Sequence, residues 1–195
     1  GVSFSGADNL VTIGANAFTG YKGSSFAFGT KLKTIGSSAF AQSAIKKIKF
    51  PDGSDIDTIG DSAFYDMESL TKVDFSNTTI GTIGSNAFSN SSSLKTVIFT
   101  DANITTIGTG AFCWDNALTK ADFSNATLDT ISTNAFRGDT KLTDVDIDGL
   151  KIKSIGDSAF YDTAISGTLD FRGTGLESIG SNAFYSQDNA SELII

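Results

Sequence analysis

Residues 94–112 read Leu-Lys-Thr-Val-Ile-Phe-Thr-Asp-Ala-Asn-Ile-Thr-Thr-Ile-Gly-Thr-Gly-Ala-Phe, and the end of this stretch recurs along the whole chain. In each copy an Ile is followed by Gly (Ser132 in one copy), two small residues and the pair Ala-Phe. The copies place their Ile at Ile13, Ile35, Ile59, Ile83, Ile107, Ile131, Ile155 and Ile179. A period of 22 and then 24 residues indicates a solenoid, in which each unit buries its apolar face by stacking on the next.

The first half of each unit predicts a short β-strand. Val97 and Phe99 flank Ile98 in a period-two pattern, so two side chains point inward and one points outward. The equivalent apolar pairs are Val2/Phe4, Phe26/Phe28, Ile48/Phe50, Val73/Phe75, Ala121/Phe123, Val145/Ile147, Leu169/Phe171 and Leu193/Ile195. We therefore expect about nine short parallel strands, one from each coil, in a single sheet.

The second half of each unit predicts a short helical turn. The residue after the Gly position is Ser, Thr or Asp in seven copies, and these side chains favour helix N-caps. In this interpretation the Ala lets the turn approach the next coil and the Phe fills the core. Because Ser132 replaces one Gly, we attribute the recurring Gly to tight packing rather than to a required positive φ.

The complete pattern, L-x-x-V-x-F followed by I-x-x-I-G-x-x-A-F, resembles the BspA-like class of leucine-rich repeats found in bacteria and protozoa. The resemblance extends from Val2 to Ile195. It implies an α/β fold: a right-handed leucine-rich-repeat solenoid with a parallel concave sheet and short helical turns on the convex side. The class often has Pro after the strand, where only Pro51 fills that place here. It often has Cys three residues after the Phe, a position held here by Tyr21, Ser43, Met67, Ser91, Asp115, Asp139, Thr163 and Gln187.

Composition argues against several functional classes. The chain has 195 residues, a formal net charge of −8 and no clustered Lys or Arg of the kind that neutralises phosphates, so we expect no nucleic-acid partner. No apolar run reaches the ~18–20 residues of a membrane span. His is absent and Cys113 is the single cysteine, which excludes a Ser-His or Cys-His catalytic pair and a four-ligand zinc site. We predict a protein that is not an enzyme and carries no cofactor.

One stretch imitates a calcium loop. Residues 144–149, Asp-Val-Asp-Ile-Asp-Gly, match the first six positions of a D-x-D-x-D-G loop. The closing position, which requires a bidentate Glu, holds Ile155. Val145 and Ile147 are also the apolar pair of a predicted strand, so we expect an extended conformation and no metal site.

The outward positions of the predicted strands carry charge. Lysines dominate the N-terminal half and aspartates the C-terminal half. The candidate ligand-binding residues on this concave face are Lys47, Lys49, Lys72, Asp74, Lys95, Lys120, Asp122, Asp144, Asp146 and Asp170. They could orient a protein of complementary charge, or the acidic row could collect a cation. Alternatively, the charges could serve only to keep an exposed face soluble.

The resemblance implies a function in binding. BspA-like proteins are known as surface adhesins, which implies an extracellular or cell-surface module that binds a protein ligand, such as a host extracellular protein. The alternative is a passive stalk or spacer that displays another domain. We interpret residues 1–195 as one solenoid of about eight repeats of 22–24 residues, excerpted from a longer protein. Because neither end carries a polar capping unit, we expect fraying or end-to-end self-association of the isolated segment.

Overall fold

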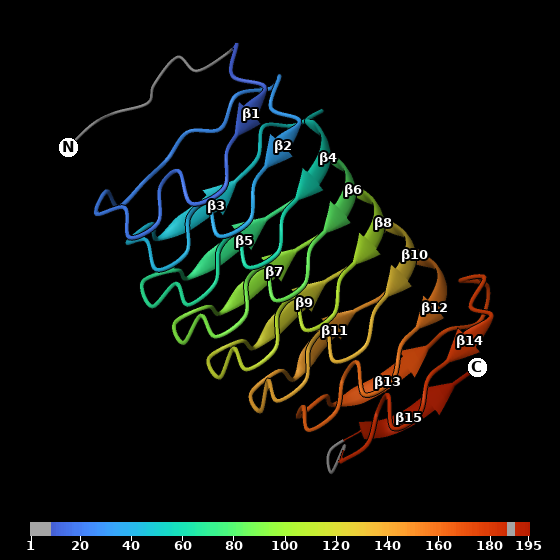
Figure 1. The fold of residues 1–195 in the computed structure, drawn as a ribbon. Coiled ribbons are helices and arrows are strands. Elements are labelled where there is room, and N and C mark those ends of the chain that lie inside the picture. The colour runs from blue at the N-terminus through green and yellow to red at the C-terminus, as the bar shows by residue number, and fades with distance from the viewer. Residues whose placement is uncertain (1–8, 187–189) are drawn as a thin grey trace.

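The computed structural model describes residues 9–186 and 190–195, which form a parallel β-solenoid (Figure 1). Successive coils stack along one axis, and each contributes a strand to one or both of two long sheets. The first strand pair, Val2/Phe4, lies outside the described residues. The predicted repeat solenoid is confirmed, but its composition differs from the α/β prediction, because the described residues form only strands and turns.

The larger sheet, here called sheet A, is the element that the sequence analysis did not predict. Its eight strands run in the order β1-β2-β4-β6-β8-β10-β12-β14. Their bounds are Thr12–Ile13 (β1), Thr34–Ile35 (β2), Asp55–Ile59 (β4), Thr79–Ile83 (β6), Asn103–Ile107 (β8), Thr127–Ile131 (β10), Lys151–Ile155 (β12) and Ser178–Ile179 (β14). The I-x-x-I part of the repeat forms these strands. In the middle coils both apolar residues are buried and in register, as with Ile80 beside Ile104 and Ile83 beside Ile107.

The second sheet, sheet B, contains the strands that the V-x-F pattern predicted. It has five strands in the order β11-β9-β7-β5-β3: Lys47–Lys49 (β3), Lys72–Asp74 (β5), Thr96–Ile98 (β7), Lys120–Asp122 (β9) and Asp144–Asp146 (β11). A separate pair, sheet C, consists of β13 (Gly167–Asp170) and β15 (Ala190–Ile194). The prediction of one sheet of about nine strands is therefore wrong. The ladder stops after β11, and Phe26 and Phe28 are buried without forming a strand.

The prediction of short helical turns is also wrong. In the six-residue turn 61–66, main-chain N–H groups alternate between two kinds of acceptor. Ala63 N–H donates to Gly60 O within the coil at 3.1 Å, and Phe64 N–H donates to Ala87 O of the next coil at 2.7 Å. Two residues in each turn have positive φ, here Ser62 at 55° and Asp66 at 57°. A helix would direct all these N–H groups along its own axis, whereas this turn uses half of them to join coils.

Two columns of phenylalanine rings fill the interior. The Phe of each Ala-Phe pair stacks on its equivalents one coil away, from Phe18 to Phe184, with ring centroids 4.9–5.3 Å apart and planes within 9°. The strand phenylalanines form the second column, as in the Phe99–Phe123 stack at 4.7 Å. The columns meet edge to face, for example Phe99 against Phe112. This confirms the predicted core role of the Ala-Phe pair.

The recurring Gly is a packing residue, as predicted. A Cβ added at Gly108 would lie 2.5 Å from the Ile83 carbonyl oxygen of the preceding coil. The φ of Gly108 is not in the positive range. The close approach between coils therefore selects Gly at this position.

Candidate functional site

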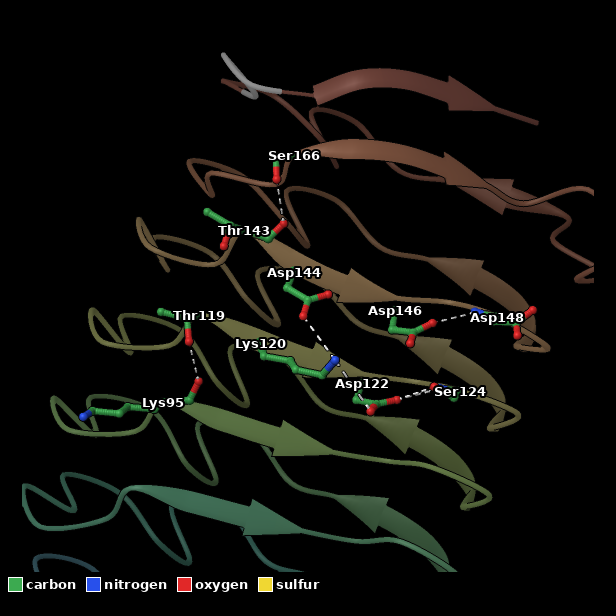
Figure 2. A network of polar contacts seen from close by, with 10 residues as sticks. All are labelled: Lys95, Thr119, Lys120, Asp122, Ser124, Thr143, Asp144, Asp146, Asp148 and Ser166. Atoms are coloured by element: carbon green, nitrogen blue, oxygen red, sulfur yellow. Dashed lines mark hydrogen bonds and ion pairs between the residues drawn. The ribbon is translucent and has the colours of Figure 1, made fainter.

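The outward side chains of sheet B form two columns, as the sequence predicted. The first column contains Lys47, Lys72, Thr96, Lys120 and Asp144, and the second contains Lys49, Asp74, Ile98, Asp122 and Asp146. The predicted residue Lys95 lies just before β7, outside both columns, with an exposed side chain (Figure 2). The remaining predicted residue, Asp170, lies on β13 of sheet C.

The charges on sheet B pair with one another. Lys120 Nζ lies 3.1 Å from Asp144 Oδ2 and 3.9 Å from Asp122 Oδ2, so its ammonium group lies between two strands (Figure 2). Lys72 Nζ lies 3.1 Å from Asp74 Oδ2. The hydrogen bond to Asp144 is the main cause of the raised pKa of Lys120. The outward face of sheet B therefore carries lysine–aspartate pairs, and its charge changes from basic near β3 to acidic near β11.

The aspartates of the second column also have a structural role. Asp122 Oδ1 accepts the Ser124 N–H at 3.1 Å, and Asp146 Oδ1 accepts the Asp148 N–H at 3.0 Å (Figure 2). Such bonds from a side chain to the main chain two residues later stabilise turns. At Asp122, desolvation raises the pKa, but the hydrogen bonds from Ser124, the charge of Lys120 and a hydrogen bond from Thr100 together outweigh this effect, and the pKa is lowered. The turn after the strand thus selects Asp in this column.

Asp74 is held by its turn and by a lysine, so little of its carboxylate is available to a ligand. The residue is 8% exposed, and its carboxylate is held by Ser76 and Lys72. Burial raises its pKa, while the bonds from Ser76 and Lys72 lower it by more. Asp74 is thus an ionised group inside a paired network, whereas Asp144 and Asp170 remain more exposed, with 56% and 41% of their side-chain surface accessible.

The C-terminal part of this face contains a hollow of about 530 Å³. It brings together three predicted residues, Asp144, Asp146 and Asp170. The other seven predicted site residues do not line it. Five lining residues that the sequence analysis missed carry charge or a hydroxyl group: Asp148, Lys151, Thr168, Arg172 and Thr174. The sequence signal for this hollow is an extra residue between Ile165 and Leu169, compared with the spacing of Ile45 and Ile48 two coils from the N-terminus.

The calcium-like segment is extended, as predicted. Asp144–Asp146 is strand β11, paired with β9. Within residues 9–186 and 190–195, no group of three or more His, Cys, Asp or Glu side chains is arranged to hold a metal ion. Cys113 is a free thiol that is 7% exposed, and burial raises its pKa.

Comparison with protein families identifies the repeat. The description "BspA type leucine rich repeat region (6 copies)" matches residues 2–119 and 105–195. The chain belongs to the BspA-type leucine-rich repeat family. Proteins of this BspA-type family are often surface proteins and are typically non-catalytic. No curated protein matches the chain.

Comparison with solved structures gives three similar leucine-rich repeat or surface-antigen chains. A leucine-rich repeat protein of T. pallidum, TpLRR, is 23% identical with a TM-score of 0.60, over 78% of this BspA-type chain and 70% of TpLRR. A leucine-rich repeat protein of Bacteroides ovatus is 20% identical with a TM-score of 0.40, over 91% of this chain and 68% of that one. The pneumococcal vaccine antigen PcpA is 16% identical with a TM-score of 0.35, over 90% and 65% of the two chains. The likeness to TpLRR supports the fold alone.

The described part of the chain contains no helix of sufficient length and apolarity to cross a bilayer.

Proposed function

We propose that this chain is a protein-binding module of a cell-surface or secreted protein, and that the sheet-B face contacts the partner. The observation that carries the proposal is the arrangement of this face. A regular sheet presents two columns of charged side chains, and a hollow interrupts it where acidic groups gather. Complementary charge on a partner would set orientation and association rate more than affinity. Membership in a family whose proteins are often at the surface supports the proposed location.

A second candidate is a passive stalk. The observation that favours it is the internal pairing of charges, since Lys120 and Asp122 satisfy neighbouring groups of the same sheet. A face whose charges are already paired has less to offer a partner. The two candidates differ in whether charge reversal on sheet B changes binding.

Surface plasmon resonance with the immobilised chain tests the proposal. The analytes are purified extracellular matrix proteins, each injected over the wild type and two variants. One variant reverses three charges on sheet B: Lys47→Glu, Lys72→Glu and Asp144→Lys. The matched control reverses three charges in and beside sheet A, of which Lys153 and Asp57 are exposed and Lys33 is half-buried: Lys33→Glu, Lys153→Glu and Asp57→Lys. We expect an analyte whose binding is lost only in the sheet-B variant. Binding that both variants retain would support the stalk.

A further inference from the structure

The ladder of sheet B is broken between β11 and β13. In the preceding coils, the residue after each strand donates its N–H to the next coil: Phe75 to Ile98 O, Phe99 to Asp122 O and Phe123 to Asp146 O, at 2.7–2.8 Å. The equivalent bond, from Ile147 N–H to Asp170 O, is missing. In the described part of the chain, no main-chain hydrogen bond joins residues 144–149 to residues 168–172. Strand β11 therefore has an unpaired edge within the array.

The break lies next to an irregular segment at the start of β13. Between the coils, Ala164 N–H still bonds to Leu142 O and Ser166 N–H to Thr143 O, both at 3.1 Å. Gly167 then takes a φ of +84°, and the pairing of β13 with β15 shifts register between Gly167 and Thr168. Gly167 pairs with Ala190 and Thr168 pairs with Glu192, so the extra residue of this bulge lies on β15. A bulge bends the strand that carries it and disrupts the ladder locally. Strand β13 pairs with β15, and β11 pairs only with β9, so the edge of β11 that faces β13 has no partner strand in the described part of the chain.

The break exposes the core as well as the main chain. In β7 and β9 the inward residues and the phenylalanines that follow them, such as Val97 and Phe123, are 0–1% exposed. Val145 and Ile147 are only partly buried. Both residues, together with Leu169 and Phe171, line a small apolar void of about 10 Å³ in the core. A group that enters between the two coils thus meets apolar side chains on the inner side.

The outer side of the hollow is acidic. Asp144, Asp146, Asp148 and Asp170 line it. Its two cations are already engaged, since Lys151 Nζ donates to Gly173 O at 2.8 Å and the Arg172 guanidinium forms a fork on Asp170. Hydrogen bonds from Arg172 lower the pKa of Asp170 to about 2. Asp144 pairs with Lys120 and Asp170 pairs with Arg172. No ion pair to Asp146 or Asp148 occurs in the described part of the chain, so basic side chains of a partner would find unneutralised carboxylates at these two residues.

We propose that the hollow binds an extended peptide segment whose residues alternate between basic and apolar and whose main chain pairs with the free edge of β11. An exposed strand edge is a template for an added strand, and main-chain hydrogen bonds supply affinity in this mode of recognition. Alternate side chains of a strand point to opposite faces. Apolar residues would cover Val145 and Ile147, and basic residues would lie beside Asp144 and Asp146. The inference rests on the proposed protein-binding function and names its partner class.

The chain itself provides a probe with this pattern. Strand β3 and its flanks, residues 46–50, read Lys-Lys-Ile-Lys-Phe, and in the solenoid Ile48 and Phe50 point inward while Lys47 and Lys49 are exposed. A fluorescent, amidated peptide of this sequence is titrated with the full 195-residue chain, and anisotropy is recorded at low ionic strength. Two control peptides have the lysines replaced by Glu, or the main-chain nitrogens of alternate residues methylated.

We expect saturable binding of the basic peptide and a loss of about tenfold or more for each control peptide. Asp144→Lys should weaken binding about tenfold, whereas Asp57→Lys, on sheet A, should leave it unchanged. Deletion of Gly167 restores the residue spacing of the second coil, should close the ladder and should abolish binding. Equal binding of the methylated peptide, or no effect of Asp144→Lys, would overturn the proposal. So would binding of the basic peptide with a stoichiometry of two chains per peptide, which would indicate a second copy at the edge.

Failure of this inference can be distinguished from failure of the proposed function. A matrix protein that loses binding to the sheet-B variant but not to the Gly167 deletion would support a protein-binding face elsewhere on sheet B. Peptide binding that the deletion abolishes would support the β11 edge site even if no matrix protein binds.

Discussion

Asp139 Oδ1 accepts the main-chain N–H of Asp115 at 2.8 Å, so that two buried carboxyl groups stack one coil apart. Asp115 Oδ1 in turn accepts the Ser91 N–H at 2.6 Å. Both aspartates are 0% exposed, and neither Oδ2 has a hydrogen-bond partner in the described part of the chain. They occupy the position three residues after the Phe. Desolvation raises the pKa of both groups well above the ordinary range, and the Asp115 charge raises that of Asp139 further.

This pair makes stability depend on pH. An acid with a raised folded-state pKa binds its proton more tightly in the folded state than in the unfolded state. The free energy of unfolding is then highest below the unfolded pKa near 4 and falls as the pH rises to the folded pKa, by about 1.4 kcal/mol for each unit of elevation. The double variant Asp115→Asn/Asp139→Asn keeps both Oδ1 acceptors and removes the titration. Urea denaturation is measured from pH 4 to pH 8. As the pH rises, the midpoint of the variant should increase relative to the midpoint of the wild type. A constant difference would contradict the prediction.

The core prediction concerns Phe112. Its ring is 0% exposed and stacks between Phe88 and Phe136, at 5.1 and 5.2 Å. Phe112→Ala should lower the free energy of unfolding by about 3–5 kcal/mol, because it leaves a cavity shared by three coils. Lys95→Ala, at an exposed position, should change it by less than about 0.5 kcal/mol. Chemical denaturation measures both, and equal stabilities would mean that the inward and outward positions are misassigned.

A third prediction concerns calcium. Because residues 144–146 are strand β11 and Ile155 stands where a calcium loop needs Glu, calorimetry should detect no Ca²⁺ binding tighter than about 0.1 mM. Asp146→Asn should leave the calorimetric trace unchanged. A micromolar isotherm that this substitution abolishes would make the acidic row a metal site.

The sequence was sufficient for the features that repeat strictly. The Ala-Phe pair and the V-x-F pattern predicted the Phe112 column and the five strands of sheet B, because burial and period-two alternation are local in origin. Sheet A was missed because I-x-x-I does not alternate with period two, so Ile104 and Ile107 read as packing residues. Stacking with neighbouring coils holds these residues extended, and no single coil encodes that pairing.

The hollow and the turn were missed for different reasons. Only Asp144, Asp146 and Asp170 of the ten predicted residues line the hollow, because the register shift at Gly167 and Thr168 departs from the repeat and a repeat-based prediction averages such a departure away. The turn did carry a signal. The residue before Ala is Asn or Gly in most coils, and these residues favour positive φ. The Ser, Thr or Asp that follows the Gly position predicted a helix N-cap, and this pattern conflicts with the positive φ.

The left-handed turn position provides the last prediction. Asn182 has a φ of 56° and an exposed side chain, so its backbone conformation can be tested with little effect on packing. Asn182→Val should destabilise the protein by at least about 1–2 kcal/mol, because a β-branched side chain meets the neighbouring carbonyl at positive φ. Asn182→Gly should be nearly neutral, since Gly adopts this conformation without steric strain. Urea denaturation of both variants at one pH gives the comparison. If the turn were helical at this position, the order would reverse, because Gly would then be the less stable of the two.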